Sequence, residues 1–241
     1  MLHPGCSPTQ LPMGPILISI VMPTLDEAGT LRARAAEIHS QEPPWEWWVV
    51  DGGSTDGTPS LARGLGAEVF DGPRGRGPQL ASGARAARGE AVLFLHADTE
   101  LPSGAVSAIR SALDEPSVVG GNFRLRFGDD SPVDRLFEAY VLFQQRVLGA
   151  FFGDSAIFCR RGALTAAGGV PELPLFEDLE LVRRLRAHGR LVQLPLSVRT
   201  SDRRYRGREV RTVLRWAALA AAHAVGTDPR WLAKFYAPHR E

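Results

Sequence analysis

Acidic side chains follow three of the apolar runs in the first hundred residues of the chain. Asp26 and Glu27 come after the first run, Asp51 ends the second, and Asp98 comes after the fourth. Carboxylates gathered in one place can bind a divalent cation, accept hydrogen bonds from a nucleoside, or take a proton from a hydroxyl group. Because like charges raise one another's pKa, three acidic strand ends at one edge predict a bound cation or a hydrogen-bonding ligand there.

A glycine-rich turn follows the second apolar run. Residues 51–58 read DGGSTDGT, and the three glycines allow a ligand to approach the backbone closely. The turn has no lysine for a phosphate-binding loop and does not match the GxGxxG dinucleotide pattern. We therefore expect a base or a ribose beside Asp51, whereas Asp56 is equally typical of a helix cap.

Positive charge and a second kind of metal ligand come from two short segments. The loop Gly72–Gly77 contains Arg74 and Arg76, which either meet a diphosphate or lie in a solvated turn. His96 and Asp98 are two positions apart, so their side chains share one side of an extended segment. Asp98 with diphosphate oxygens is typical of a Mg²⁺ site, and a coordinating His96 favours Mn²⁺; the alternative for His96 is a structural hydrogen bond.

These residues need a sheet that brings the ends of the apolar runs together. Runs typical of strands buried on both faces are Ile16–Met22, Glu46–Val50, Ala67–Phe70 and Ala91–Leu95. Helices are expected between them over Leu31–Ser40, Thr58–Leu65 and Pro78–Arg88. This alternation predicts an α/β fold with a mostly parallel central sheet flanked by helices, in which ligands bind at the carboxyl ends of the strands.

The second half of the chain is less regular. Its expected elements are a strand Val118–Phe127, a helix Val133–Val147, a strand Ala156–Cys159, a helix Leu175–His188, a strand Leu191–Leu194, and helices Val210–Val225 and Pro229–Tyr236. No internal repeat, low-complexity tract or long linker divides the chain. A single compact domain with C-terminal helices is therefore predicted.

The composition is that of an ordinary globular protein and excludes several classes. The 241 residues carry a formal net charge of +1, so no global basic field indicates nucleic-acid binding, and Lys234 is the only lysine among 28 basic residues. Cys6 and Cys159 form neither a disulfide framework nor a zinc motif. No segment has the roughly 20 apolar residues of a membrane-spanning helix or the pattern of a secretory signal, so we expect a cytoplasmic protein.

Five segments, in this order, resemble the motifs of the family 2 glycosyltransferases, which have the Rossmann-like GT-A fold. They are Met22–Glu27 (MPTLDE), Val49–Thr58 (VVDGGSTDGT), Phe94–Thr99 (FLHADT), Gly153–Phe158 (GDSAIF) and Phe176–Leu181 (FEDLEL). The segments LHADT and PLFEDLEL are similar, more narrowly, to a bacterial subgroup associated with arsenosugar biosynthesis.

The resemblance also implies an organisation of the chain. A flexible tail at residues 1–14 would precede a GT-A domain at 15–205, and a helical extension would follow at 206–241. Within the domain, residues 15–100 would form the nucleotide-binding half and residues 101–205 the acceptor and catalytic half.

The resemblance implies a role for each matching residue. Asp98, with His96, would bind the metal. Asp178 and Glu177 would be the catalytic residues, with Asp178 as the base that takes the proton of the acceptor hydroxyl, and Gly153 and Asp154 would lie beside the acceptor. The residues that would line the nucleoside pocket are Pro23, Thr24, Asp26, Glu27, Asp51 and Gly53, of which Asp51 would bind the base, usually uracil. From the residues alone, Glu177 and Asp178 have an alternative role: they could simply be acids of the first turn of a helix, where negative charge is stabilised by the helix dipole.

Two positions depart from the family pattern. His96 occupies the first acidic position of the DxD motif, which leaves the metal open between Mn²⁺ and Mg²⁺. Leu80 and Ala81 replace the usual Arg-Asn pair before a glycine, so Arg76 is expected to supply the contact with the donor.

An arginine-rich stretch precedes the C-terminal helices. Residues 199–215 contain seven arginines and two acids, and the resemblance implies that Arg204 in the segment TSDRRY closes over the donor diphosphate. For the amphipathic helix that follows, the alternatives are packing on the domain, contact with a membrane surface and a dimer contact, and packing is preferred.

The expected activity is that of a metal-dependent, inverting glycosyltransferase. It would move a sugar from a nucleotide-diphosphate donor, expected to be a UDP-sugar, to an acceptor hydroxyl. The alternatives are a nucleotidyltransferase of similar fold and a non-catalytic nucleotide-sugar-binding protein. The sequence leaves the sugar, the acceptor and the oligomeric state open.

Overall fold

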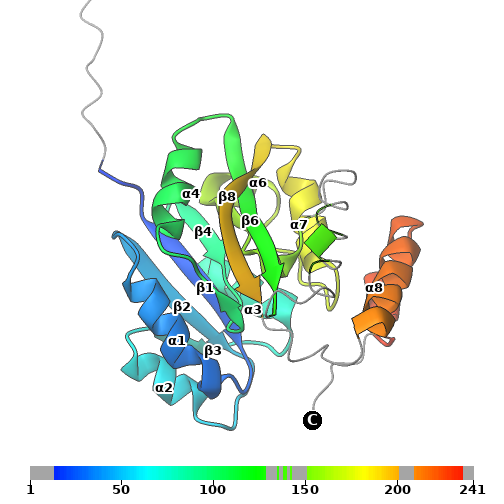
Figure 1. Cartoon of the computed structure of the whole chain (residues 1–241), viewed down its shortest axis with the longest axis horizontal. Coiled ribbons are helices and arrows are strands. Elements are labelled where there is room, and N and C mark those ends of the chain that lie inside the picture. The colour runs from blue at the N-terminus through cyan, green and yellow to red at the C-terminus, as the bar shows by residue number, and fades with distance from the viewer. Residues whose placement is uncertain are drawn as a thin grey trace, which may run out of the picture.

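The computed structural model describes residues 14–128, 135, 138, 139, 142, 151–200 and 209–235. Arg204 and most of the helix expected over Val133–Val147 lie outside the described residues. The described part forms one central sheet with helices on both of its faces (Figure 1).

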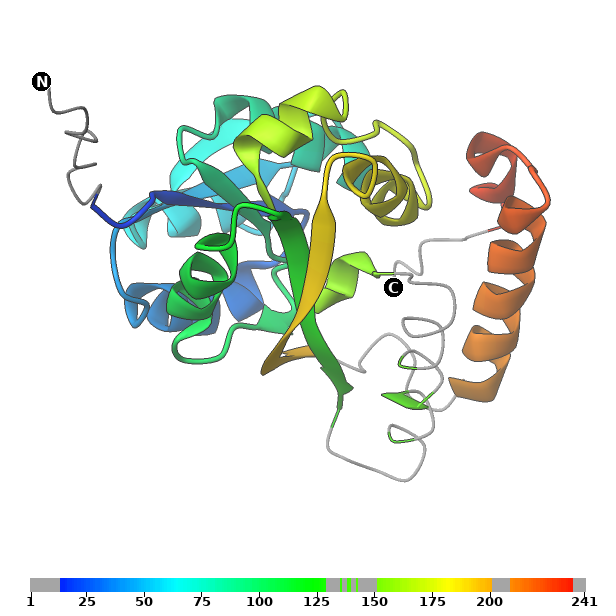
Figure 2. The ribbon, with the colours of Figure 1, turned by 90° about the horizontal axis from the view of Figure 1, so that it is seen from above.

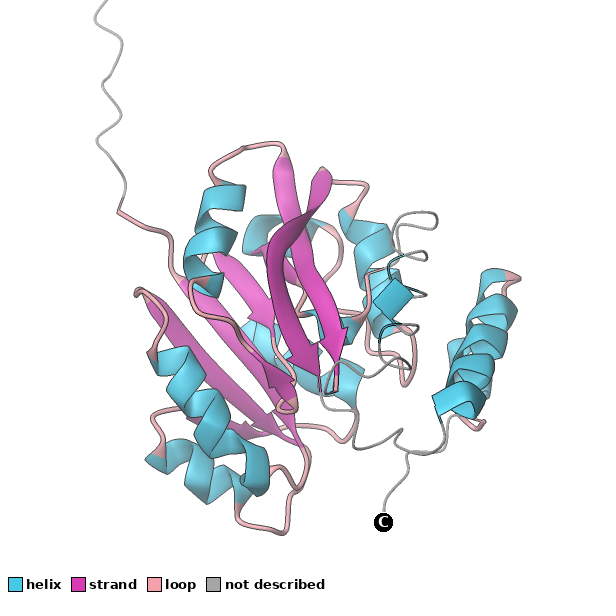
Figure 3. Cartoon of the chain, in the orientation of Figure 1, coloured by secondary structure: helices cyan, strands magenta, loops and turns pink. Residues whose placement is uncertain are grey.

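The sheet has eight strands among the described residues (Figure 3). They are β1 (Ile18–Thr24), β2 (Trp45–Asp51), β3 (Glu68–Asp71), β4 (Ala91–Phe94), β5 (Thr99–Glu100), β6 (Val118–Phe127), β7 (Phe158–Arg160) and β8 (Arg190–Thr200). Their order across the sheet is β3-β2-β1-β4-β7-β6-β8-β5. The first four are parallel, β7 is antiparallel to β4 and β6, β6 is parallel to β8, and β5 is antiparallel to β8. The predicted mostly parallel sheet is confirmed, and the carboxyl ends of β1, β2 and β4 lie at one edge.

Helices pack on both faces of the sheet and enclose two separate hydrophobic cores. They are α1 (Ala28–His39), α2 (Thr58–Gly64), α3 (Arg76–Ala86), α4 (Ala105–Leu113), α6 (Arg161–Ala166), α7 (Glu177–Leu185), α8 (Glu209–Ala224) and α9 (Pro229–Leu232), with a short 3-10 helix at Gly153–Ser155. Apolar residues of α1 and α4 belong to one core, and those of α3, α6 and α7 belong to the other.

The alternation of side chains in the strands explains why both faces are covered. Ile20 and Met22 of β1 pack in the core of α1 and α4, whereas Val21 between them packs in the core of α3 and α7. Trp47 and Trp48 of β2 likewise contact opposite cores, as predicted for neighbouring residues of a strand. Burial on both faces is the reason that the runs are continuously apolar.

Close contacts with β1 and β2 hold α3 on the sheet at two points along the helix. A Cβ atom on Gly83 would lie 2.3 Å from Cγ1 of Val21, so only glycine permits this approach. Near the start of the helix, Nε2 of Gln79 donates to the carbonyl oxygens of Thr24 and Val50, each at 2.8 Å. The first turn of α3 is therefore attached to the ends of two strands.

Most of the predicted elements are observed, with shifted ends. β6 has the predicted bounds, whereas β8 continues to Thr200, well beyond the predicted Leu191–Leu194. The pairing of β6 with β8 shifts its register around Pro195, so the strand continues past a residue that lacks an N–H donor. The elements α4, α6 and β5 were not among those predicted.

The C-terminal helices lie at the edge of the molecule and pack on it through a small cluster (Figure 2). Leu219 of α8 and Leu232 of α9 contact Leu175, which lies just before α7. Packing, the preferred alternative for this amphipathic helix, is therefore observed. Among the described residues, no helix is long and apolar enough to span a membrane.

Candidate functional site

The turn after β2 surrounds the carboxylate of Asp51 with hydrogen-bond donors. Its Oδ2 accepts the N–H groups of Gly53 (2.9 Å) and Ser54 (2.8 Å), and its Oδ1 accepts the hydroxyls of Ser54 (2.5 Å) and Thr24 (3.1 Å). Burial acts to raise the pKa of Asp51, but these hydrogen bonds outweigh it and lower the pKa below its ordinary value. The expectation that repulsion raises the pKa of these strand-end acids is therefore wrong for Asp51, because local donors compensate its charge.

Asp26 and Asp56 connect the turn after β1 with the turn after β2. Asp26 has a left-handed φ of 55°, and its Oδ1 accepts the N–H of Thr55 at 2.7 Å. Asp56 accepts the N–H groups of Ala28 (2.9 Å) and Thr58 (3.0 Å), the first residues of α1 and α2. The N-cap residues are Glu27 for α1 and Gly57 for α2, so Asp56 is not itself a helix cap, although its carboxylate accepts the first N–H of both helices.

The other residues expected around the nucleoside lie in the same two turns. Pro23 and Thr24 end β1 in register with Val50 and Asp51. The N–H of Glu27 donates to the hydroxyl of Thr58 across the two turns at 2.9 Å. The structure thus brings together a polar group that we name the strand-end rim: Pro23, Thr24, Asp26, Glu27, Asp51, Gly53 and Ser54.

His96 and Asp98 lie in a turn and not in an extended segment. β4 ends at Phe94, and the N–H of Thr99 donates to the carbonyl oxygen of His96 at 3.1 Å. The expectation of an extended segment over His96 and Asp98 is therefore wrong, because this bond closes a turn over residues 96–99. In the part of the chain that the structure describes, no group of three or more His, Cys, Asp or Glu side chains is arranged to hold a metal ion.

His96 points toward the 3-10 helix that contains Gly153 and Asp154. Its Nδ1 lies 2.9 Å from Oδ1 of Asp154, while its Nε2 is buried without a hydrogen-bond partner among the described residues. A Cβ atom on Gly153 would lie 3.3 Å from Cε1 of His96 and 3.3 Å from Oδ2 of Asp178. A side chain in place of Gly153 would therefore require the imidazole and the carboxylate to move by a few tenths of an ångström.

Arg76, the first residue of α3, lies among three carboxylates. Its Nε is hydrogen-bonded to Oε1 of Glu177, and its terminal nitrogens lie 3.8 Å from Asp178 and 3.9 Å from Asp154. The side chain of Arg76 is 36% exposed, whereas that of Glu177 is 2% exposed. We name Arg76, Asp154, Glu177 and Asp178 the arginine–carboxylate cluster.

The carboxylate of Asp178 combines burial with directed hydrogen bonds. Oδ2 accepts the N–H of Gly153 at 2.6 Å, and Oδ1 accepts the N–H of Leu179 at 2.8 Å. Burial and the neighbouring charge of Glu177 raise the pKa of Asp178, against the opposing effects of Arg76 and the two N–H groups. Burial acts to lower the pKa of Arg76, but the carboxylates raise it well above its ordinary value. The result is a carboxylate of increased proton affinity beside a permanent cation, which suits a general base.

Two residues that shape this cluster were not predicted to do so. Phe176 precedes α7 with a left-handed φ of 63°, and its ring stacks on His223 of α8 with centroids 4.7 Å apart. A positive φ at a residue other than glycine leaves no mark in the sequence. Gln79 fixes the start of α3, and its place three residues after Arg76, on the same side of the helix, was the available signal.

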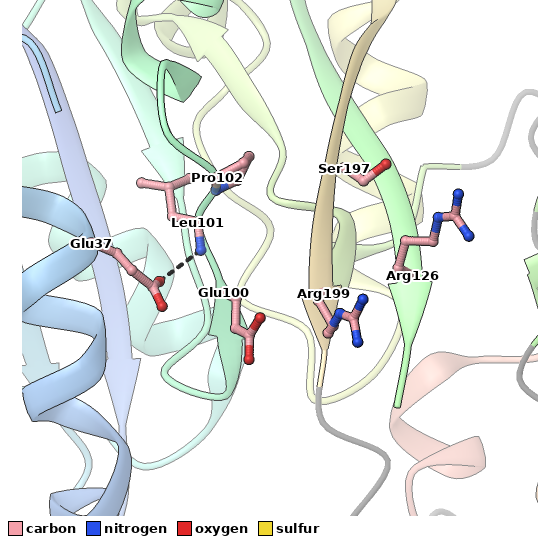
Figure 4. Close-up of a pocket in the computed structure, with 7 residues that line it drawn as sticks. All are labelled: Glu37, Glu100, Leu101, Pro102, Arg126, Ser197 and Arg199. Carbon is pink, nitrogen blue, oxygen red and sulfur yellow. Dashed lines mark hydrogen bonds between the residues drawn. The ribbon is translucent and has the colours of Figure 1, made fainter. Parts of the chain in front are cut away.

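Two cavities among the described residues lie away from both polar groups. One, of about 440 Å³, is lined by Glu37, Glu100, Leu101, Pro102, Arg126, Ser197 and Arg199 (Figure 4). The other, of about 760 Å³, lies between α3, α6, α7 and the loop after α6, and reaches Arg230 of α9. Neither contains a residue of the strand-end rim or of the arginine–carboxylate cluster, so the candidate site is identified by its chemistry and its place at the sheet edge.

Comparison with known proteins identifies a family. The family model described as glycosyl transferase family 2 matches residues 19–165. No curated protein sequence matches the chain.

Solved structures share the fold. The structure of residues 1–349 of S. aureus TarS in complex with UDP-GlcNAc has a TM-score of 0.64 at 18% identity, over 77% of this chain and 58% of that one. The mannosyltransferase PcManGT from Pyrobaculum calidifontis, in complex with GDP-Man and Mn²⁺, has a TM-score of 0.61 at 21% identity, over 92% of this chain and 78% of that one. A mycobacterial protein has a TM-score of 0.54 at 25% identity, over 77% and 65%.

Proposed function

Because the chain belongs to glycosyltransferase family 2, we propose that it transfers a sugar from a nucleotide-diphosphate sugar to an acceptor hydroxyl, with inversion at the anomeric carbon. The observation that carries the proposal is the arginine–carboxylate cluster, which sets a carboxylate of raised pKa beside an arginine next to the strand ends. A nucleotidyltransferase is disfavoured because the glycine-rich turn has no lysine.

The strand-end rim is proposed to bind the nucleoside. The two oxygens of Asp51 differ in how they are held, since Oδ2 accepts backbone N–H groups and Oδ1 accepts the hydroxyls of Thr24 and Ser54. A hydroxyl can rotate away, and a backbone N–H cannot. We therefore assign Oδ1 as the atom that accepts an N–H of the base, in exchange for one of the hydroxyls. UDP-sugars and GDP-sugars are both compatible with this exchange.

Arg76 is proposed to contact the donor diphosphate. Its Nε is committed to Glu177, which fixes the plane of the guanidinium. Its terminal nitrogens lie 3.8 Å from Asp178 and 3.9 Å from Asp154, beyond hydrogen-bond distance, and the side chain is 36% exposed. These nitrogens can donate to diphosphate oxygens and stabilise the negative charge that develops as the sugar leaves. Arg204 is proposed as a second contact of this kind.

A divalent cation, Mn²⁺ or Mg²⁺, is proposed to accompany the donor. Asp98 offers one carboxylate, and the described residues hold no group of three ligands, which fits a cation that takes most of its oxygen ligands from the diphosphate. The buried, unpartnered Nε2 of His96, in the same turn as Asp98, is the other candidate donor. When bound, the cation would neutralise charge on the leaving diphosphate.

Asp178 is proposed as the base that accepts the proton of the acceptor hydroxyl. The acceptor oxygen forms a bond to the anomeric carbon, the bond from that carbon to the diphosphate breaks, and the acceptor proton passes to the carboxylate of Asp178. A single displacement of this kind inverts the anomeric centre. Gly153 and Asp154 would border the acceptor, since the N–H of Gly153 orients Asp178 and Asp154 holds His96.

Glu177 is proposed to position Arg76 and not to take the proton itself. Its Oε1 is bonded to Arg76, and its side chain is almost completely buried. The narrower likeness to the subgroup associated with arsenosugar biosynthesis, carried by LHADT and PLFEDLEL, is likewise part of the proposal. It directs the acceptor search toward sugar-bearing and polyol-bearing small molecules.

The test is a panel of nucleotide sugars with Mn²⁺, Mg²⁺ or a chelator. In thermal unfolding, one nucleotide sugar of the panel should stabilise the protein by about 2.7 kcal/mol when it is present at 100 times its dissociation constant. The same donor should release nucleoside diphosphate when the acceptor is supplied. Stabilisation that is equal with metal and chelator would remove the cation from the proposal, and no stabilisation by any nucleotide sugar would contradict the proposed function.

A further inference from the structure

Exposed apolar side chains are concentrated at one place in the molecule. Among the described residues, the large hydrophobic side chains that remain exposed are Val225 (84%), Trp231 (51%) and Phe235 (54%). All three lie within eleven consecutive residues at and after the end of α8. The rings of Trp231 and Phe235 contact each other, with centroids 4.6 Å apart, so they form one apolar surface.

Basic residues alternate with these apolar residues. Arg230 and Lys234 are exposed and each directly precedes one of the two aromatic residues. Asp228 is the only acid in residues 225–235, and its carboxylate accepts the N–H of Arg230 at 2.8 Å as the cap of α9. We name Val225, Arg230, Trp231, Lys234 and Phe235 the aromatic–basic patch.

The positive charge continues beyond this patch into the larger cavity. That cavity of about 760 Å³ is lined by four arginines and one glutamate, and Arg230 belongs both to it and to the patch. The other arginines are Arg85, Arg161 and Arg184, and the glutamate is Glu172. The flank of the molecule that carries the apolar surface is therefore also a basic flank.

We propose that the aromatic–basic patch docks the protein on an anionic membrane surface. Tryptophan and phenylalanine insert at the level of the lipid headgroups, while flanking arginine and lysine contact anionic headgroups. The two kinds of contact together give reversible binding where either alone is marginal.

The available area disfavours a second copy of the chain as the occupant. Three partly exposed side chains offer on the order of 300 Å² of apolar surface, given the 150–250 Å² of a whole aromatic side chain. A stable interface needs about 800 Å² from each partner. A symmetric dimer through this patch would also bring Arg230 and Lys234 close to their own copies, with repulsion between like charges.

The patch is connected to the loop that leads into the candidate site. Leu232, between Trp231 and Lys234, packs on Leu219 of α8 and on Leu175, two residues before Glu177. Docking through the patch would therefore bring the candidate site close to the membrane. The docking itself does not depend on the proposed transferase activity.

Vesicle flotation of the whole chain tests the proposal. Vesicles of phosphatidylcholine with phosphatidylglycerol should bind the protein, and binding should fall as salt is raised, whereas vesicles of phosphatidylcholine alone should bind much less. The double variant Arg230→Gln/Lys234→Gln should lower the partition coefficient on anionic vesicles by about 25-fold, since each basic residue near such a surface contributes about fivefold.

Two further variants make the result specific. Trp231→Ser/Phe235→Ser should also abolish most of the binding, and both side chains are half-exposed, so the fold is retained. Arg32→Gln/Arg63→Gln, which removes the same charge from exposed positions on α1 and α2, should bind like the wild type. The proposal would be overturned if the control variant lost as much vesicle binding as Arg230→Gln/Lys234→Gln. It would also be overturned if the wild type bound neutral and anionic vesicles equally well, or bound neither. A concentration-dependent dimer that Trp231→Ser/Phe235→Ser dissociates would also overturn it, in favour of self-association.

Discussion

The pKa values of two buried aspartates, Asp51 and Asp178, are shifted in opposite directions. Asp51 and Asp178 are 2% and 8% exposed, and each accepts two backbone N–H groups. Yet the pKa of Asp51 is lowered and that of Asp178 is raised. For Asp178 the largest cause is burial, to which the neighbouring carboxylate of Glu177 adds, whereas at Asp51 two additional hydroxyl donors help the hydrogen bonds to outweigh burial.

The comparison separates a carboxylate whose charge is compensated locally, Asp51, from the one proposed as the base, Asp178. The charge of Asp51 is compensated by donors two or three residues away and by Thr24 on the neighbouring strand, so this charge stabilises the turn. The charge of Asp178 is compensated incompletely and from a distance, by Arg76 at 3.8 Å. A carboxylate that is held in place but poorly compensated retains affinity for a proton, which is what catalysis by a base requires.

Asp178→Asn should have the largest effect, and it acts on turnover. Loss of a general base lowers kcat by 10²- to 10⁴-fold, while the dissociation constant of the donor should change little. Release of nucleoside diphosphate measures the first quantity and calorimetry the second. Glu180→Gln on the same helix is the matched control, because Glu180 pairs with Arg183 and Arg184 and takes no part in the cluster. An Asp178→Asn protein with normal turnover would refute the assignment of the base.

Arg76→Gln should have the next largest effect, on stability. It leaves the buried Glu177 without its cation, and removing one partner of a buried pair costs about 3–5 kcal/mol. Because Arg76 is 36% exposed, we expect a smaller loss than this, about 2–3 kcal/mol, in urea unfolding at neutral pH. Arg85→Gln, on the same helix, breaks the exposed pair with Glu172 and should cost less than about 1 kcal/mol. Similar losses in the two variants would mean that burial does not distinguish the pairs.

Asp51→Asn, which changes the other aspartate of the pair, should lower the free energy of unfolding by about 2 kcal/mol. The amide oxygen can still accept the N–H groups of Gly53 and Ser54, but hydrogen bonds to a charged acceptor become bonds to a neutral one, and an amide nitrogen replaces the acceptor of the two hydroxyls. Equilibrium unfolding of the variant measures this. Asp71→Asn provides the control, since Asp71 is the exposed end of β3, in register with Asp51, and should change stability by less than about 0.5 kcal/mol.

Acid should affect the two carboxylates in different ranges of pH. The lowered pKa of Asp51 means that its contribution to stability is present above its ordinary value of 3.8 and is lost as pH falls through the lower folded value. The stability difference between wild type and Asp51→Asn should therefore shrink below pH 3.8. By contrast, kcat/KM should fall with decreasing pH through a pKa above 3.8, because protonated Asp178 cannot act as a base.

Removal of Arg76 tests whether Asp178 controls the pH dependence of kcat/KM. Arg76 lowers the pKa of Asp178, so Arg76→Gln should move the acidic limb of kcat/KM to higher pH. An acidic limb at the same pH in the wild type and in Arg76→Gln would show that Asp178 does not control it.

Most of the helices and strands, and the sheet edge at which the acidic residues lie, could be predicted from the sequence. Continuous apolar runs of β-branched residues have to be buried on both faces, so the parallel strands and the carboxylates at their ends followed from local pattern. The turn around Asp51 was equally local, because its backbone donors are two and three residues away. The motif order identified Asp178 and Asp98 as candidates before any contact was known.

The contacts between these residues, and the pKa shifts that result from them, could be found only from the tertiary structure. Arg76 and Glu177 are 101 residues apart in sequence, and His96 and Asp154 are 58 apart. The turn at residues 96–99, the left-handed Phe176 and the clustering of exposed aromatic residues after α8 were also invisible in the pattern. The physical reason is that hydrogen bonds within a turn are set by neighbouring residues, whereas burial and Coulomb interactions depend on distances that exist only once distant segments have packed together.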